Sequence, residues 1–147
     1  MAKIVCSSII EQDGKYLLVK ENKDIAKGRY SFPQGSLEDD EDIFEGTIRE
    51  TKEETGLRVN LKNIIGIYQR PETAEGNNIT VFVFRGSTSS GYMQKSDKHP
   101  EVGFFSYDEI KILDKEDRLR SPYMIPALED CIKGNPIPLS FLKVIRD

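Results

Sequence analysis

The chain has 147 residues, 37% of them hydrophobic and 31% charged, which suits one compact domain over residues 1–147 with a single core. The net charge of −4 at pH 7 argues against long nucleic acid as a partner, because proteins that bind it usually carry a basic face. Since no apolar run has the length of a membrane span and residues 1–10 lack the regions of a signal peptide, we expect a cytoplasmic protein without a membrane partner.

Two apolar, β-rich runs at residues 4–10 and 15–20 open the chain, joined by the turn-forming sequence QDG. We therefore expect two antiparallel strands. The polar segment 21–30 that follows contains three cations that could approach a negatively charged ligand, namely Lys23, Lys27 and Arg29. A surface that serves only solubility is the alternative for this segment.

The next segment, SFPQGS, combines a proline and a glycine. Pro33 favours an extended backbone before it, and Gly35 permits backbone conformations that other residues resist. Residues 37–41 form a predicted loop, whose acidic side chains, including Asp40 and Glu41, favour the positive end of a following helix.

A helix is predicted after this loop, ending at Gly56 in the left-handed conformation. Its residues Glu50, Glu53 and Glu54 have the spacing i, i+3 and i+4, so they project from one face. Like charges at this spacing repel, and they need either full solvation or a cation that neutralises them. Oxygen ligands suit Mg²⁺ or Mn²⁺, whereas a solvated acidic helix with surface ion pairs is the alternative.

The other helix positions fall on three sides. Gly46 and Ile43 share the side of the carboxylates, where a small residue leaves space for a ligand. Arg49 lies on a second side, four residues from both Glu45 and Glu53, where its guanidinium can hold a carboxylate in place. The opposite stripe, which should face the core, contains Phe44, Thr47, Ile48, Thr51 and Thr55.

Three further strands are expected beyond the helix. Residues 57–60 and 63–69 read as short strands, and residues 79–85 as a central strand covered on both faces. Turn formers fill residues 70–78. Residues 86–100 are a long Ser- and Gly-rich connection, and such long loops are usually functional or mobile.

The last third of the chain predicts a strand at residues 102–106, a short helix at 107–113 and a charged linker at 114–119. A final helix, with Ser121 as N-cap and Pro122 at its first position, should run to about Lys133, and Pro126 is either tolerated near its start or marks a later beginning.

Three residues bear on other kinds of chemistry. Cys6 and Cys131 are far apart and lack the spacing of metal ligands, so we expect reduced thiols buried in the core. His99 is the single histidine, which makes a histidine-centred catalytic triad a weak hypothesis.

Seven residues have the spacing of the Nudix hydrolase signature, which this chain closely resembles: Gly35, Glu41, Arg49, Glu50, Glu53, Glu54 and Gly56. Thr51 departs from the signature, because a bulky aliphatic residue is usual there. The resemblance implies an α/β fold, the Nudix α/β/α sandwich around a central mixed β-sheet. It also implies Mg²⁺- or Mn²⁺-dependent hydrolysis of a small nucleotide or related pyrophosphate, and a homodimer is common in the family.

The resemblance also implies roles for individual residues. Glu50 and Glu54 would be metal ligands, Glu53 a ligand or the group that activates water, and the carbonyl of Gln34 a further ligand. Glu53, Glu50 and Arg49 form the predicted catalytic set, with the division of labour among the glutamates left open. Five residues are candidates for substrate binding: Arg29, Arg70, Asp97, Glu101 and Arg120. Some family members place an additional acidic metal ligand near Asp97 and Glu101.

The substrate has several interpretations. The sequence LRSPY at residues 119–123, with a final helix and a Pro-rich tail, resembles the NudJ-type phosphatases, which hydrolyse nucleoside di- and triphosphates and thiamin-type pyrophosphates. A motif that only starts a helix is the alternative. The sequence FPQG resembles dinucleoside polyphosphate and RNA 5′-end hydrolases, and Pro71 lies near a proline of ADP-ribose hydrolases.

Two functions of another kind are also compatible with this fold. One is a noncatalytic nucleotide-binding module, and the other is an isomerase that acts on a diphosphate ester. A degenerate module should have lost at least one of Glu50, Glu53 and Glu54, and all three are present.

Overall fold

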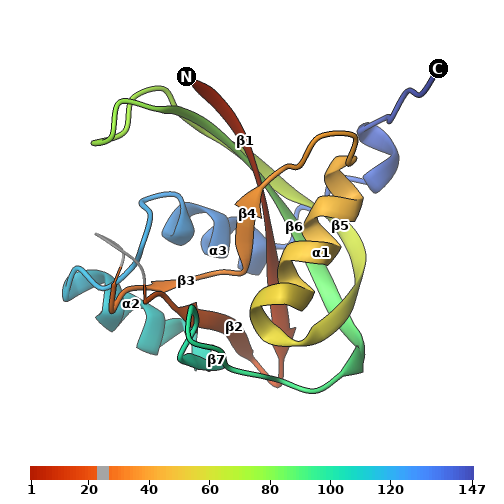
Figure 1. The fold of residues 1–147 in the computed structure, drawn as a ribbon. Coiled ribbons are helices and arrows are strands. Elements are labelled where there is room, and N and C mark those ends of the chain that lie inside the picture. The colour runs from red at the N-terminus through yellow and green to blue at the C-terminus, as the bar shows by residue number, and fades with distance from the viewer. Residues whose placement is uncertain (23–26) are drawn as a thin grey trace.

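A computed structural model describes residues 1–22 and 27–147, and in it helices cover both faces of a mixed β-sheet (Figure 1). Helix α1 (Ile43–Thr55) covers one face, and helices α2 (Tyr107–Lys115) and α3 (Met124–Lys133) cover the other. This is the predicted α/β/α sandwich. None of the helices in these two ranges is long and apolar enough to cross a membrane.

The sheet is organised around its first strand. The strands are β1 (Ala2–Gln12), β2 (Lys15–Lys20), β3 (Tyr30–Ser31), β4 (Gln34–Ser36), β5 (Leu57–Arg70), β6 (Asn78–Gly91) and β7 (Glu101–Ser106). Strand β1 pairs in parallel with β6 on one side and antiparallel with both β2 and β4 on the other. The predicted β1–β2 hairpin is confirmed, and both turn residues, Asp13 and Gly14, have the positive φ that a tight hairpin turn requires.

Strand β6 extends further than the sequence predicted. The segment expected to begin a long loop at residue 86 instead continues β6 to Gly91, paired with Leu57–Leu61 of β5. Backbone hydrogen bonds hold this Ser-rich arm to β5. Its side chains from Ser89 onward are exposed, and its sequence lacks the apolar pattern by which strands are recognised. The predicted break near residue 62 is a shift of register within one continuous strand β5.

A stripe of threonines attaches α1 to the sheet. Thr47, Thr51 and Thr55 are buried, and each hydroxyl donates to the carbonyl four residues before it. The Thr51 hydroxyl is also 2.8 Å from that of Ser8 on β1. This second contact gives a physical reason for a threonine where the family usually has an aliphatic residue.

Both ends of α1 are capped. Asp42 is the N-cap and forms a capping box with Glu45, and Gly56 ends the helix with φ of 81°, as predicted. Ile43 was placed on the carboxylate side, but it is buried in the core below the helix. The C-terminal segment, with its 3₁₀ helix η2 (Leu139–Phe141), packs against this same end of the helix.

The final helix starts after Pro122, and Pro126 is tolerated near its start. Its first residue is Met124, and Tyr123 in the N-cap position makes no capping hydrogen bond with its side chain. The Ser121 hydroxyl, predicted to cap the helix, instead accepts a hydrogen bond from Arg70.

Both cysteines are buried and free, as predicted. Burial raises the pKa of the Cys6 thiol to about 11, and burial also raises the pKa of Cys131. Neither thiol therefore has the thiolate character of a reactive cysteine.

Candidate active site

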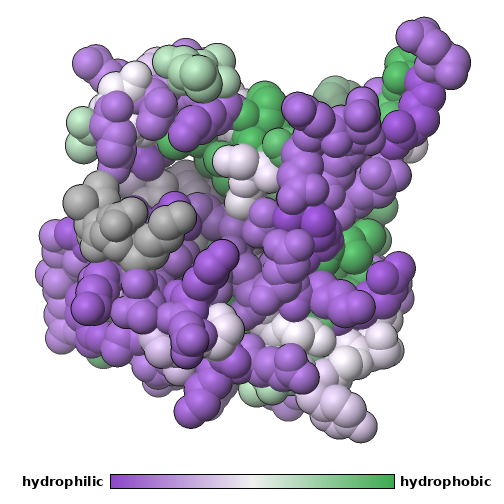
Figure 2. All heavy atoms as spheres, viewed as in Figure 1, coloured by the Kyte–Doolittle hydropathy of each residue, from purple (hydrophilic) through white to green (hydrophobic). Residues whose placement is uncertain are grey.

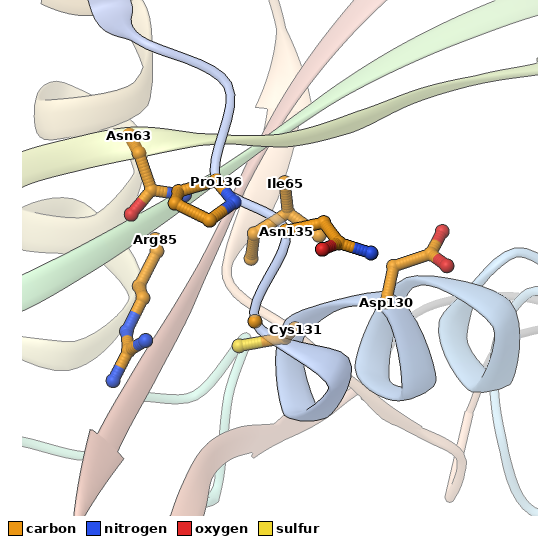
Figure 3. Close-up of a pocket in the computed structure, with 8 residues that line it drawn as sticks. Asn63, Ile65, Arg85, Asp130, Cys131, Asn135 and Pro136 are labelled. Atoms are coloured by element: carbon orange, nitrogen blue, oxygen red, sulfur yellow. The ribbon is translucent and has the colours of Figure 1, made fainter.

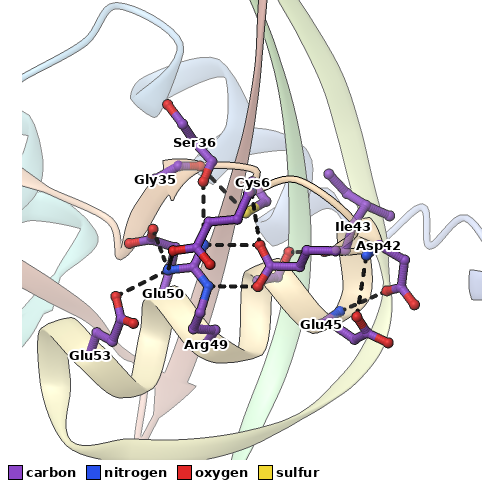
Figure 4. Close-up of polar contacts among 12 residues, drawn as sticks. Cys6, Gly35, Ser36, Asp42, Ile43, Glu45, Arg49, Glu50 and Glu53 are labelled. Carbon is purple, nitrogen blue, oxygen red and sulfur yellow. Dashed lines mark hydrogen bonds and ion pairs between the residues drawn. The ribbon is translucent and has the colours of Figure 1, made fainter.

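Two glutamates of α1, Glu50 and Glu54, face strand β4 at close range. Figure 4 shows Glu50 beside Gly35. A Cβ atom at Gly35 would lie 2.1 Å from the carboxyl carbon of Glu50, so only glycine leaves room for this side chain. The φ of Gly35 is outside the left-handed region. The glycine is therefore needed for space, not for the unusual backbone conformation that we predicted.

Arg49 binds the neighbouring carboxylates. Its Nε and one terminal nitrogen donate to the two oxygens of Glu41 at 2.6 and 3.0 Å. Its other terminal nitrogen donates to Glu50 at 2.9 Å and to Glu53 at 3.1 Å. The fork predicted for Arg49 is present, with Glu41 rather than Glu45 as its partner, and its hydrogen bonds lower the pKa of Glu41.

Glu50 and Glu54 are held largely away from solvent, with side chains 15% and 10% exposed. Burial raises the pKa of Glu50 despite its hydrogen bond with Arg49. Burial raises the pKa of Glu54 well above its usual range, and the charge of Glu50 adds to this effect. Each carboxylate is thus penalised as an anion, and a bound divalent cation would relieve the penalty.

The third glutamate is oriented differently. The Glu53 side chain is 57% exposed and turns to Arg49, as Figure 4 shows. Within residues 1–22 and 27–147, no three His, Cys, Asp or Glu side chains are grouped closely enough to hold a metal ion as they stand. A site with all three glutamates would therefore need Glu53 to rotate away from Arg49.

Gly46 serves packing rather than a ligand. A Cβ atom there would lie 2.7 Å from Leu37 and 2.9 Å from a carboxylate oxygen of Glu41. The space that we predicted for a ligand is therefore filled by the protein itself.

Gln34 lies beside the glutamates and contacts them through its backbone. Its N–H donates to Oε1 of Glu54 at 3.0 Å. Its side-chain oxygen accepts a hydrogen bond from the hydroxyl of Tyr123, which is buried below the site.

A chain of polar side chains connects Glu54 to Arg120. Nε2 of His99 lies 3.6 Å from Oε2 of Glu54 and 3.4 Å from Oε2 of Glu21, and the other oxygen of Glu21 accepts from Arg120 at 3.0 Å. We call these four residues the buried polar chain, although its outer member, Arg120, has a side chain that is 39% exposed. Its members are far apart in sequence, and a charged residue directly after the apolar strand β2 is the only local signal.

Four of the five residues predicted to bind substrate are engaged by other residues of the protein. Arg29 pairs with Asp117 at 3.0 Å, and Glu101 accepts from Tyr30. Arg70 donates to Ser121, and Arg120 belongs to the buried polar chain. Asp97 is exposed, Lys27 is exposed on the loop before β3, and Lys23 lies outside the described residues.

Two hollows in the described part of the surface lie away from these glutamates. Figure 3 shows one of about 120 Å³ between β5 and the end of α3, lined by residues that include Arg85, Asp130 and Cys131. It is smaller than typical small-molecule pockets of roughly 300 Å³ or more. An open hollow of about 400 Å³ lies beside β7 and includes Glu101. Neither is lined by the glutamates of α1, whose outer side carries mainly hydrophilic residues (Figure 2).

The donor set of the α1 face fits a hard divalent cation. Carboxylate oxygens of Glu50 and Glu54 are acceptors only, and each has a raised pKa because the protein withholds solvent from it. Oxygen donors of this kind suit Mg²⁺ or Mn²⁺. The glycine at position 35 keeps the space in which Glu50 lies.

This fold and this arrangement of acidic residues define a class of metal-assisted hydrolases, and comparisons with known proteins agree. The family model of the NUDIX domain matches residues 2–128. A protein named ADP-ribose pyrophosphatase from Methanocaldococcus jannaschii is 30% identical over 122 residues, which are 82% of this chain and 72% of that protein. A MutT-like protein of Streptomyces ambofaciens is 30% identical over 85% of this chain and 73% of its own length.

A solved structure gives the same result. A NUDIX hydrolase from Nitrosomonas europaea superposes with a TM-score of 0.90 at 30% identity, covering 99% of this chain and 98% of that one. The chain described here therefore belongs to the Nudix family, and it is a Nudix hydrolase.

Proposed function

We propose that this chain is a Mg²⁺- or Mn²⁺-dependent pyrophosphohydrolase that cleaves a phosphoanhydride bond in a nucleoside diphosphate derivative. The observation that carries the proposal is the pair of buried carboxylates, Glu50 and Glu54, facing Gly35 and the backbone N–H of Gln34. Carboxylates whose pKa values are raised by burial are suited to bind a cation, because binding supplies the opposite charge that the protein withholds.

The proposed roles follow from position. Glu50 and Glu54 would hold the cation, with the Gln34 carbonyl as a further ligand. When bound, the cation supplies charge neutralisation of the diphosphate and a lowered pKa for a bound water. Glu53, the most exposed of the three, would act as a further ligand or accept the proton of the attacking water. Arg49 would hold the carboxylates of Glu41, Glu50 and Glu53 in position through its hydrogen bonds.

ADP-ribose is the first substrate to test. Support comes from the relative named ADP-ribose pyrophosphatase, which aligns with 82% of this chain at 30% identity. The NudJ-type substrates, nucleoside di- and triphosphates and thiamin pyrophosphate, are the second hypothesis. Arg120 gives them little support, because its guanidinium is engaged by Glu21. Dinucleoside polyphosphates complete the panel.

The test is hydrolysis of this panel with Mg²⁺ or Mn²⁺ by wild type and the variants Glu50→Gln, Glu53→Gln and Glu54→Gln. We expect release of AMP from ADP-ribose and a loss of kcat by several orders of magnitude in each variant, with the fold retained. Glu75→Gln, in the exposed turn between β5 and β6, is the matched control and should keep wild-type activity.

Two results would contradict the proposal. Variants that keep most of the metal-dependent activity would remove the assigned roles from the glutamates. A wild type that binds these nucleotides and hydrolyses none of them would favour the noncatalytic binding module.

Cytoplasmic residence, a single domain and a homodimer remain predictions. The first two follow from the composition of the chain, and the third is what family resemblance suggests. Light scattering on purified protein measures the mass in solution, for which 16.7 kDa is the monomer and twice that value the dimer.

A further inference from the structure

We infer that His99 is a positioning residue that, with Glu21 and Arg120 behind it, fixes the orientation of the Glu54 carboxylate for cation binding. The inference rests on the proposed function, because it takes Glu54 as a ligand of the divalent cation. It assigns His99 a role through Glu54, not a contact with substrate.

The two oxygens of Glu54 have separate partners. Oε1 accepts from the backbone N–H of Gln34 at 3.0 Å, and Oε2 lies 3.6 Å from Nε2 of His99. The second distance is longer than a hydrogen bond, so His99 acts on Oε2 as a close polar neighbour whose attraction favours one rotation of the carboxylate. His99 thus supplies the second of the two constraints that define the orientation of Glu54.

The burial of Glu54 and its neighbours makes the two partners of its carboxylate important. The side chains of Glu21, Glu54 and His99 are only 7%, 10% and 11% exposed, so solvent cannot replace a missing partner. The same burial separates the imidazole from a substrate at the surface. His99 therefore acts through its neighbours and not on the reacting atoms.

The backbone fixes the position of His99. The Ser96 N–H donates to the carbonyl of His99, and the His99 N–H donates back to the Ser96 hydroxyl, which closes a tight loop. Asn22, directly after Glu21, bonds to this loop twice, with its backbone N–H to the Lys98 carbonyl and with its side chain to the Asp97 carbonyl. His99 and Glu21 are thus held to each other by their main chains.

Arg120 affects how His99 is divided between its two carboxylate neighbours, Glu21 and Glu54. Nε2 of His99 faces two carboxylates, and Glu21 holds a second donor, Arg120, at 3.0 Å. Without that guanidinium, Glu21 would keep His99 as its remaining side-chain partner and would draw the imidazole, already 3.4 Å away, further from Glu54. Loss of Arg120 is therefore expected to weaken Glu54 as a ligand without any direct contact between Arg120 and substrate.

The test measures Mn²⁺ affinity without substrate, from the free Mn²⁺ signal in electron paramagnetic resonance. Loss of partners that orient a metal ligand typically lowers affinity about 10- to 100-fold, and we expect His99→Leu to fall in this range. His99→Gln, whose amide can donate near the position of Nε2, should stay within a few-fold of wild type. Arg120→Leu should show a smaller loss, and Arg58→Leu, an exposed arginine on β5, should show none.

A double-mutant comparison separates positioning from a general structural effect. In a Glu54→Gln background, His99→Leu should cause no further loss of Mn²⁺ affinity, because the group it positions is already changed. In the single variant, excess Mn²⁺ should restore kcat while the KM for nucleotide stays unchanged. Equal losses in both backgrounds, or no loss in either, would overturn the inference.

Two outcomes remain distinguishable. If Glu50→Gln and Glu54→Gln bind Mn²⁺ like wild type, the proposed function fails, whatever His99 does. If these controls lose affinity and the His99 and Arg120 variants do not, only the inference fails. Should His99→Leu unfold, as judged by circular dichroism, Arg120→Leu in both backgrounds gives the same decision, since Arg120 is 39% exposed and leaves no buried cavity.

Discussion

At the scale of single residues, Gly35 and Glu50 depend on each other for space. The glycine has no side chain to block the carboxylate, and Arg49 holds that carboxylate in place at 2.9 Å. A substitution of Gly35 therefore tests how closely α1 must approach β4 for activity.

Gly35→Ala is expected to reduce kcat at least about 10²-fold, because a misplacement on the order of 1 Å at a reacting site has an effect of this size. The new methyl group would lie within 2.4 Å of the three carboxyl atoms of Glu50 and would displace them. Gly103→Ala in β7 is the control, since its Cβ would meet only Phe105 at an ordinary 3.8 Å. Equal kinetics for the two variants would show that the Glu50 position is not critical.

Glu54 gives a prediction for pH dependence without metal. Its folded-state pKa is raised above 4.5, so the folded chain binds a proton that the unfolded chain has already released. In EDTA, stability should therefore fall as pH rises from about 4.5 through the raised pKa. Glu54→Gln removes this loss and is expected to be more stable than wild type above that window, by on the order of 1 kcal/mol or about 2–4 °C in Tm.

Thermal unfolding of both proteins across this pH range measures the effect. The difference in Tm should shrink toward pH 4.5, and Glu75→Gln should track wild type throughout. A Glu54→Gln variant that is less stable at neutral pH would show that its contacts with Gln34 and His99 outweigh its burial.

At the scale of elements, α1 is held from outside by the C-terminal segment. Ile137 forms two backbone hydrogen bonds with Ile64 of β5, and Leu139 and Leu142 pack on the cluster below the helix. Arg146 donates to Asp42 and Glu45, the two members of the capping box. The segment thus joins the start of α1 to the sheet edge.

Deleting residues 136–147 should destabilise the protein by about 3 kcal/mol or more, because three partly buried aliphatic side chains each lose burial worth roughly 1 kcal/mol. Deleting only residues 144–147 removes Arg146, whose side chain is 56% exposed, and should cost less than about 1 kcal/mol. Urea unfolding compares the two. Equal losses would mean that the ion pair, not the apolar contact, holds the segment.

Elements with strong local chemistry could be predicted from sequence. The first hairpin has its QDG turn, and the end of α1 has Gly56 in the left-handed conformation. Residues 86–91 could not be predicted as strand, because their Ser-rich sequence has no apolar alternation and is ordered by backbone pairing with β5. The predicted N-cap of α3 was wrong, because the Ser121 hydroxyl accepts a hydrogen bond from Arg70 instead of capping the helix.

At the scale of the whole molecule, the candidate site combines local and distant residues. The signature predicted Glu50, Glu54 and Arg49 as site residues, and helical spacing predicted a fork from Arg49, although its partner is Glu41. It gave no indication of His99 or Glu21, because the contacts that join them to Glu54 span tens of residues and depend on tertiary structure.

Strand β1 lies inside the sheet, and this has a consequence for synthesis on the ribosome. Residues 2–10 pair with residues 78–86, so β1 is translated well before this partner strand is made. Until then, a nascent chain carries an apolar strand whose inner edge is open, the kind of edge that chaperones cover. Completion of the sheet, and with it the surface on which α1 rests, is therefore delayed until β6 has been translated.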